Sequence, residues 1–337
     1  MSRPELILLR NEKFELEILN LGATMRRFSV RLPDDTWRNV ILGSHQISDY
    51  LTSNLYVGMT VGRVANRLGK GKFELEGDSY SLEINEAPNQ LHGGSSGFHS
   101  QYWRVEDKSD ECVELSLVSP DGDQGFPGEV KAKARYELLA NGAQVTYTAV
   151  TDKPTVVNMT THPYFNLLGE TSGSIDEHTL KINASRYTPN HPDGIPTGEI
   201  RDVTNTAADF RNGKKFGIAH ADCFSDGIDR SGGFDHNFVI DGVGLREHCQ
   251  LVSPDGLTLS VESDQPAFQL YGGNHFNGTQ IGTSGLGYVQ RAGLALECQG
   301  FPDAPNHENF PSIRLNPGET YSATTRWIIS NSQNIVE

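Results

Sequence analysis

Apolar and polar side chains alternate along most of this chain, and short runs of turn-forming residues separate the alternating segments. Alternation with a period of two is typical of a β-strand that has one buried face. Glycine, proline, asparagine or aspartate bounds each segment, as tight turns between strands require. On this pattern we predict strands at residues 14–19, 71–77, 111–118, 144–150, 178–182, 238–240, 248–252, 257–262, 267–271 and 320–328.

Helical periodicity is scarce in the same sequence. We find no long amphipathic helix and predict only one short helix, at residues 44–51. The 35 glycines and 16 prolines suit a protein that is rich in turns. The chain shows no repeat of fixed period and no change of composition typical of a linker, so we expect one domain over residues 1–337. Strands at this spacing must bury one face against another sheet, which favours an all-β antiparallel sandwich.

A strand predicted at residues 294–299 carries a carboxylate in the middle of one face. Leu294, Leu296 and Cys298 form its apolar face, whereas Glu297 points to the opposite face among small and polar residues. A turn rich in proline and asparagine follows. A glutamate on a strand is most often exposed to solvent, so this position gains interest only from a second strand of the same kind.

The second strand is predicted at residues 156–165 and carries a histidine. Its apolar face is formed by Val157, Met159, Thr161 and Phe165. Its other face is formed by Asn158, Thr160, His162 and Tyr164. A histidine and a glutamate on the polar faces of two strands are the parts that paired acid/base chemistry needs.

The charge balance narrows the classes of partner. The 337 residues include 43 acidic and 28 basic ones, for a formal net charge of −15. Nucleic-acid binding needs clustered lysine and arginine, so this composition argues against nucleic acid. No run of about 18 apolar residues and no apolar leader is present, so we expect neither a membrane span nor a signal peptide.

The cysteines and histidines show no metal-binding pattern. The four cysteines are scattered and form no C-x-x-C pair, which favours a reducing compartment, so we expect a cytoplasmic protein. The 11 histidines form neither an H-x-x-x-H pair nor a cluster with zinc spacing. No glycine-rich loop ends in Gly-Lys-Ser or Gly-Lys-Thr. We therefore expect neither a metal nor a cofactor.

Several other short segments carry polar groups suited to a small ligand. They contain Asn66, Arg67, His92, Asp235 and Gln269. Taken singly, an exposed arginine or a histidine that caps a turn explains such residues equally well. Taken together with His162 and Glu297, they describe a pocket of neutral hydrogen-bonding groups with one arginine, two carboxylates and two imidazoles, which suits the hydroxyl groups of a sugar.

The order of these segments resembles the aldose 1-epimerase family. The matching segments are Gly62-Arg-Val-Ala-Asn-Arg, Asn89-Gln-Leu-His-Gly-Gly, Asp121-Gly-Asp-Gln-Gly-Phe-Pro-Gly, His162-Pro-Tyr-Phe-Asn-Leu, Asp235-His-Asn-Phe, and Leu296-Glu-Cys-Gln with Pro302-Asp-Ala-Pro-Asn-His. The resemblance runs in order from about residue 15 to residue 328. It implies the large antiparallel β-supersandwich of galactose mutarotases. It also implies conversion between the α and β anomers of free hexoses such as galactose and glucose, with no cofactor.

Residue by residue, the resemblance implies that Glu297 is the general base and His162 the general acid. The implied sugar-binding residues are Asn66, Arg67, His92, Asp235 and Gln269. The chain departs from the family pattern at Pro163 and Cys298, where small polar residues are usual, and at Gly272-Gly273-Asn274. These departures concern fine specificity, because none of them removes an acid/base group.

On the residues alone, the two histidines are rivals for the role of the acid. His162 lies in a predicted strand, whereas His92 lies beside Gly93 and Gly94, where we expect a looser backbone. A proton donor must hold its geometry to within about an ångström, which favours His162. An imidazole, with an ordinary pKa near 6.5, suits an acid that works around neutral pH.

Other function classes stay open at this stage. A glycosidase uses two carboxylates, for which Asp235 and Glu297 are available, and release of a second sugar from a disaccharide would reveal it. A sugar sensor on the same fold has no need to keep both His162 and Glu297. A phosphosugar epimerase needs more positive charge than Arg67 provides, so we expect neutral hexoses as substrates.

We predict that EDTA leaves the activity unchanged and that added nicotinamide or phosphate cofactors do not raise it. The reason is that the sequence offers no metal-ligand or dinucleotide-binding spacing. Polarimetry of freshly dissolved α-D-galactose, with and without the chelator, checks this. A loss of activity that zinc or manganese restores would contradict it.

Overall fold

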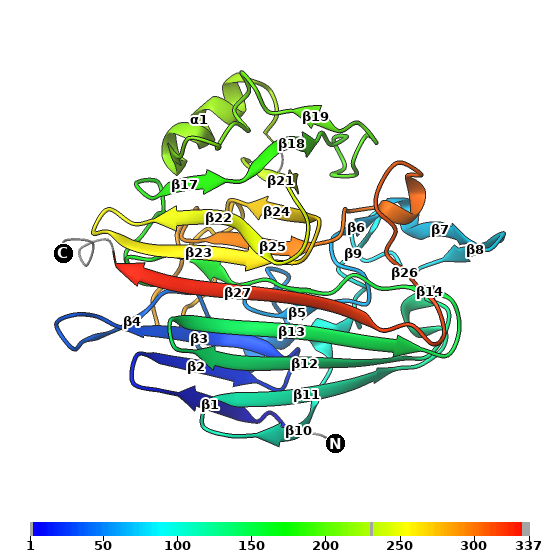
Figure 1. The fold of residues 1–337 in the computed structure, drawn as a ribbon, viewed down its shortest axis with the longest axis horizontal. Helices are drawn as coiled ribbons and strands as arrows, with labels where there is room; N and C mark the ends of the chain where they lie inside the picture. The colour runs from blue at the N-terminus through cyan, green and yellow to red at the C-terminus, as the bar shows by residue number, and fades with distance from the viewer. Residues whose placement is uncertain (1–2, 230–231, 332–337) are drawn as a thin grey trace.

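The computed structural model describes residues 3–229 and 232–331, and its strands form antiparallel sheets (Figure 1). The largest sheet has nine strands. Their spatial order is β10 (Arg104–Lys108), β11 (Cys112–Ser119), β12 (Val130–Leu139), β13 (Gly142–Thr151), β27 (Tyr321–Asn331), β23 (Leu257–Ser263), β22 (Arg246–Val252), β17 (Thr179–Ile182) and β20 (Lys214–Lys215).

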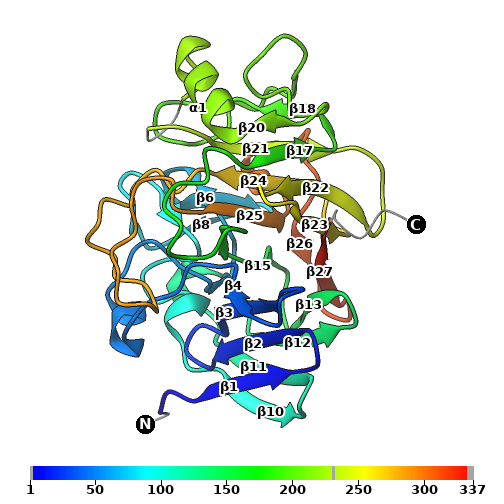
Figure 2. The same cartoon turned by 90° about the vertical axis from the view of Figure 1, so that its left-hand side faces the viewer.

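Two further sheets of more than two strands pack with it. The six-stranded sheet has the order β16 (Tyr164–Phe165), β25 (Leu294–Gln299), β24 (Ala267–Tyr271), β21 (Asp235–Ile240), β18 (Ala184–Thr188) and β19 (Arg201–Asp202). The four-stranded sheet consists of β1 (Leu6–Arg10), β2 (Phe14–Leu19), β3 (Thr24–Arg31) and β4 (Trp37–Asn39). Figure 1 shows β24 and β25 behind β22 and β23, and Figure 2 gives the same arrangement from the side.

Short elements complete the described chain. The two-stranded sheets are β5 (Thr60–Val61) with β15 (Thr160–Thr161), β6 (Arg67–Leu68) with β9 (Gln90–Leu91), β7 (Lys72–Leu75) with β8 (Asp78–Ser81), and β14 (Thr155–Val156) with β26 (Arg314–Leu315). The helices are α1 (Phe216–Ser225) and the 3₁₀ helices Ile47–Leu51, Gly69–Gly71, Phe98–Ser100, Asp123–Gly125 and Ala304–Asn306. Among the described residues, none of the helices has the length and apolar character needed to cross a lipid bilayer.

The main hydrophobic core joins the three large sheets. One buried cluster contains Phe28 of β3, Tyr136 of β12, Leu296 of β25 and Trp327 of β27. Each large apolar side chain that leaves water stabilises the fold by roughly 1.5–3 kcal/mol. The six-stranded sheet gives only one of its faces to this core, because its side chains alternate between two faces. Its other face carries polar residues beside a smaller buried apolar cluster that includes Tyr271.

The predicted all-β antiparallel fold is confirmed. The strands predicted at residues 14–19 and 267–271 coincide with β2 and β24. The single strand predicted at residues 156–165 is wrong. That segment contains the last residue of β14 and the whole of β15 and β16, because its backbone groups pair in turn with β26, β5 and β25.

Several elements are absent from the sequence-based prediction, among them β1, β3, β10, β12, β18 and helix α1. Helix α1 buries Phe216, Ala219 and Cys223 at helical spacing, but the helix is too short for that period to stand out. Strand β12 alternates clearly, yet alanines occupy part of its buried face and weaken the apolar signal. The helix predicted at residues 44–51 is a 3₁₀ helix over Ile47–Leu51.

Candidate active site

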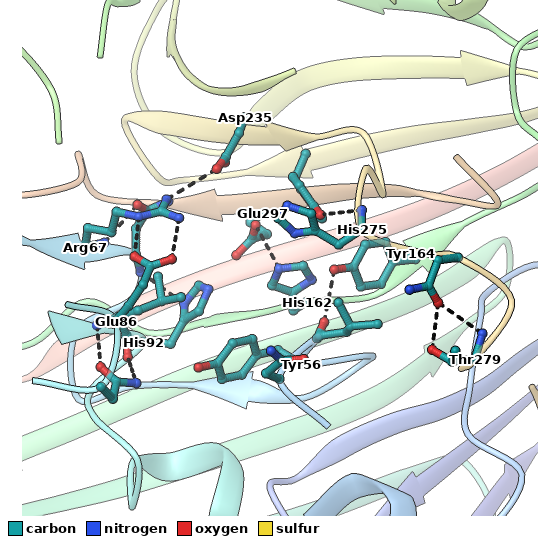
Figure 3. Close-up of a pocket in the computed structure, with 17 residues that line it drawn as sticks. Tyr56, Arg67, Glu86, His92, His162, Tyr164, Asp235, His275, Thr279 and Glu297 are labelled. Carbon is teal, nitrogen blue, oxygen red and sulfur yellow. Dashed lines mark hydrogen bonds and ion pairs between the residues drawn. The ribbon is translucent and has the colours of Figure 1, made fainter. Parts of the chain in front are cut away.

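A pocket with a volume of about 450 Å³ opens over the polar face of the six-stranded sheet (Figure 3). Six of the seven predicted site residues line it: Asn66, Arg67, His92, His162, Asp235 and Glu297. Asn66 and Arg67 are neighbours, but the six residues come from five segments that are far apart in the sequence, so only the folded chain brings these segments together. The seventh, Gln269, does not line the pocket.

Strand register places the carboxylates of the pocket. Across the sheet, Asp235 of β21 pairs with Tyr271 of β24, and Gln269 of β24 pairs with Glu297 of β25. Because paired residues share a face, these four side chains all point away from the core. Gln269 lies behind Asp235, and its Nε2 donates a hydrogen bond to Asp235 Oδ1 at 2.6 Å. Gln269 therefore lies next to the predicted site residues, but it holds the carboxylate of Asp235 in place and does not line the pocket.

His162 lies between β15 and β16, and backbone hydrogen bonds hold it on both sides. Its N–H donates to the carbonyl of Met59, and its carbonyl accepts from the N–H of Gly58, both at 2.9 Å. Its ring packs against Tyr164 with a centroid separation of 4.8 Å. In this position His162 Nε2 lies 3.3 Å from Glu297 Oε1. The predicted acid and base are thus in direct contact.

Burial moves this pair toward its uncharged form. The Glu297 side chain is 2% exposed and that of His162 is 5% exposed. Loss of hydration raises the pKa of Glu297 well above its ordinary value, and the negative charge of Asp235 raises it further. Burial lowers the pKa of His162 to about 4, although Asp235 acts in the opposite direction. A protonated Glu297 facing a neutral His162 is therefore the favoured state of the empty pocket.

His92 is held as firmly as His162, which corrects the expectation of a looser backbone. Its N–H donates to the carbonyl of Asn66, and its Nδ1 accepts from the N–H of Asn66, both at 3.1 Å. A Cβ atom at Gly93 would lie 2.0 Å from the carbonyl oxygen of Gly62. Glycine is therefore needed here for close contact between two backbone segments, and it does not loosen the histidine.

The hydrogen bond from the N–H of Asn66 to His92 Nδ1 determines which nitrogen of the His92 ring carries the proton. His92, His162 and Glu297 form a group whose metal-ligating atoms lie within 4.8 Å of one another. Nδ1 of His92 accepts a hydrogen bond, so the neutral ring carries its proton on Nε2, and burial lowers its pKa well below the ordinary value. A protonated nitrogen donates a hydrogen bond but does not bind a metal ion. This tautomer suits a ligand oxygen better than a metal.

Arg67 lies at one end of the pocket between two carboxylates. Its Nε and Nη2 donate to the two oxygens of Glu86 at 2.6 and 2.8 Å, and Nη1 donates to Asp235 Oδ2 at 3.3 Å. Figure 3 shows Glu86 and Asp235 on opposite sides of the guanidinium. Burial lowers the pKa of Arg67, but Asp235 and Glu86 outweigh burial and the pKa is raised overall. Arg67 therefore stays charged.

The other residues of the pocket wall were not predicted as site residues from the sequence. They are Asn54, Leu55, Tyr56, Asn85, Glu86, Leu91, Tyr164, Tyr271, His275, Asn277 and Thr279. Tyr164 and Tyr271 could have been found, since each shares a strand face with a predicted site residue. Most of the others lie in loops, where no period marks the direction of a side chain.

Cys298, one of the positions at which the chain departs from the family pattern, lies away from the pocket. Cys298 belongs to the main core, on the face of β25 opposite to Glu297. Burial raises the pKa of its thiol to about 12, so the thiol is uncharged. The side chain cannot contact a ligand beside Glu297, and we therefore assign it no part in specificity.

Comparisons with known proteins show which family the sequence of this chain resembles. A family model described as aldose 1-epimerase matches residues 5–327. The galactose mutarotase of Bos taurus is 40% identical over 319 residues, which cover 94% of this chain and 91% of that protein. The aldose 1-epimerase of Haemophilus influenzae is 38% identical over 328 residues, which cover 95% and 94% of the two chains.

Solved structures give the same result for the fold. The crystal structure of an aldose epimerase homologue from C. elegans matches with a TM-score of 0.90 and 28% identity, over 98% of this chain and 99% of that chain. The galactose 1-epimerase of Lactobacillus acidophilus matches with a TM-score of 0.84 and 31% identity, over 98% and 95% of the two chains.

We predict that Glu297→Gln stabilises the fold at neutral pH. The raised pKa of Glu297 means that its favourable contribution is complete below the ordinary value of 4.5 and is lost as the pH rises toward the raised value. A glutamine side chain does not titrate, so its contribution to stability does not change with pH in this way. The gain in the free energy of unfolding should therefore grow between pH 5 and pH 8, to about 0.5–2 kcal/mol.

Urea denaturation of both proteins at the two pH values measures this difference. Glu12→Gln is the matched control, because Glu12 is exposed and its substitution should give a small difference that does not change with pH. An equal gain for Glu297→Gln at both pH values would contradict the raised pKa.

Proposed function

The chain belongs to the aldose 1-epimerase family, and we propose that His162 and Glu297 are the acid/base pair with which it interconverts the α and β anomers of free hexoses such as galactose and glucose. As a member of this family, the protein is an isomerase that acts on carbohydrates. The resemblance seen in the sequence is thereby confirmed, as is the fold of the galactose mutarotase type. The observation that carries the residue assignment is the contact of 3.3 Å between His162 Nε2 and Glu297 Oε1 at the base of the pocket.

The reaction needs one base and one acid on neighbouring oxygens of the sugar. Glu297 takes the proton of the anomeric hydroxyl while His162 protonates the ring oxygen, and the bond between C1 and the ring oxygen breaks to give the open-chain aldehyde. Rotation about C1–C2 and closure with the proton transfers reversed give the other anomer. Each correctly positioned group of this kind is worth about 10²–10⁴-fold in rate.

The buried pair holds the right number of protons for this chemistry. A protonated Glu297 with a neutral His162 differs from a carboxylate with an imidazolium only by one proton transfer across their contact. Sugar hydroxyls that donate to Glu297 favour the charged arrangement, because hydrogen bonds to a carboxylate stabilise its ionised form. Binding of the sugar therefore prepares the base and the acid together.

The rest of the pocket suits recognition of hydroxyl groups. We assign sugar contacts to Asn66, Arg67, His92 and Asp235, which line the pocket and offer both donors and acceptors. Gln269 contributes by holding Asp235. Tyr56 adds a hydroxyl that stays protonated, since burial raises its pKa to about 12.

A glycosidase is less well supported by the same geometry. Such an enzyme needs a second carboxylate that works with Glu297, and Asp235 is the candidate. Asp235 already accepts hydrogen bonds from Arg67 and Gln269, whereas the group in contact with Glu297 is His162.

We also propose that residues 1–337 act as one domain in the cytoplasm, with a free sugar as the ligand and with neither nucleic acid nor membrane as a partner. The main core supports one domain because it contains residues from Ile7 to Ile329. The four cysteines are scattered along the chain and form no C-x-x-C pair, which fits a reducing compartment.

We predict that Glu297→Gln lowers the rate of anomer conversion by at least 10²-fold, because an amide of the same shape is no useful base. Polarimetry of freshly dissolved α-D-galactose and α-D-glucose measures the rate, and Glu12→Gln serves again as the control. Activity within tenfold of the wild type would remove Glu297 from the role of base.

A second prediction separates the two histidines. His162→Asn should lower kcat sharply with a modest change in KM, because the proton donor acts only in the transition state. His92→Asn should raise KM and retain more turnover, because its Nε2–H binds the sugar throughout. If His92→Asn damages kcat more than His162→Asn, the two roles are exchanged.

A further inference from the structure

The pocket contains a pair of charges that the proposed reaction does not use. Glu86 lies in the segment between β8 and β9 and lines the pocket, with 39% of its side chain exposed. Its carboxylate pairs with the guanidinium of Arg67 and not with the acid/base pair (Figure 3). Its role therefore concerns what Arg67 can bind.

Arg67 offers two kinds of hydrogen-bonding edge. The edge formed by Nε and Nη2 presents two parallel N–H groups, which is the geometry that recognises a carboxylate or a phosphate. Glu86 occupies this edge with both of its oxygens, at 2.6 and 2.8 Å. Nη1 donates to Asp235 instead. Of the five N–H donors of the guanidinium, two remain for uncharged sugar hydroxyls.

The chain around Arg67 keeps this arrangement in place. A Cβ atom at Gly194 would lie 2.8 Å from Arg67 Nε, so the backbone of a neighbouring loop packs directly against the guanidinium. The side chain of Arg67 is only 13% exposed. The guanidinium cannot easily turn to present a different edge, so a ligand carboxylate can reach the edge formed by Nε and Nη2 only by displacing Glu86.

The local charge adds a second barrier to anionic ligands. Two carboxylates, Glu86 and Asp235, surround one guanidinium, so this end of the pocket has a negative sum of charges. A negative group on a sugar held in a pocket of about 450 Å³ stays close to both. Like charges repel more strongly in such a partly buried site than in bulk water.

We propose that Glu86 is a specificity-determining residue that restricts the pocket to neutral aldoses and excludes hexuronates, the sugar acids of the same ring size. This inference rests on the proposed function and deepens it, because it names the substrate class and the residue that sets it. The carboxylate of Glu86 occupies the edge of Arg67 formed by Nε and Nη2, which the carboxylate of a hexuronate would otherwise bind.

The test compares galactose and galacturonate as substrates by polarimetry, with the uncatalysed rate subtracted. In the wild type, kcat/KM for galacturonate should be at least tenfold below that for galactose. In Glu86→Ala the edge of Arg67 is free, and the ratio of the two kcat/KM values should shift toward galacturonate by at least tenfold. The shift should come mainly from a lower KM for galacturonate, because the acid/base pair is untouched.

Two further variants make the result specific. Glu86→Gln keeps the shape but removes the charge, so it should shift the ratio in the same direction by a smaller factor, and it carries the test if Glu86→Ala does not fold. Glu83→Gln is the matched control: Glu83 lies in the same segment, accepts a hydrogen bond from the N–H of Ser95 at 2.9 Å and does not line the pocket. It should leave the ratio unchanged.

The outcomes separate this inference from the proposed function. A wild-type protein that does not accelerate galactose mutarotation would remove the proposed function itself. A wild type that is active on galactose, together with unchanged ratios in both Glu86 variants, would overturn the inference alone. Loss of galactose activity with no gain for galacturonate would also overturn it, and would make Glu86 a residue that only positions Arg67.

Discussion

The six-stranded sheet can bury only one of its faces in the main core, and the site depends on this constraint. Leu294, Leu296 and Phe268 enter the core with Trp327 of the nine-stranded sheet. Since side chains of a strand alternate, the residues between them must point to the other side. Register then aligns Glu297 with Gln269 and Asp235 with Tyr271. The apolar packing that stabilises the fold thus also places the carboxylates of the pocket.

Burial at the base of the pocket has opposite consequences for stability and for chemistry. A carboxylate removed from water is costly, and the raised pKa of Glu297 records that cost. The same loss of hydration favours a protonated Glu297 and a neutral His162, so one proton transfer across their contact separates the uncharged pair from the charged one. Acid/base catalysis uses such a transferable proton, because the group that gives a proton must also be able to take it back. A site made more stable by an uncharged residue would lose this property.

Hydrogen bonds from neighbouring residues decide what each polar group offers to a ligand. The N–H of Asn66 fixes the tautomer of His92 and makes its outward nitrogen a donor. Glu86 fills one edge of Arg67, and Gln269 holds Asp235. In each case a residue that lines the pocket has its hydrogen-bonding chemistry set by a neighbouring side chain or backbone group. The hydrogen-bond donors and acceptors that the pocket offers are therefore determined by pairs of residues and not by single residues.

The sequence by itself determined the class of fold, the direction of most strand side chains and six of the residues that line the pocket. Glu297 could be placed opposite Leu296 from alternation alone, because that pattern follows from strand geometry whatever the strand pairs with. The order of the matching motifs supplied the family, and with it His162, Arg67 and Asp235. These are local properties of the chain, or properties of the order of its segments.

Only the tertiary structure decided which of these residues meet. The contact between His162 and Glu297, the turn of Gln269 toward Asp235 and the firm hold on His92 by Asn66 depend on strand pairing between distant segments. Glu86 was not predicted at all, since it lies in a loop whose direction no period reveals. The physical reason is that alternation gives the face of a side chain but neither the register nor the partner of its strand. Those follow from long-range packing, which no local pattern encodes.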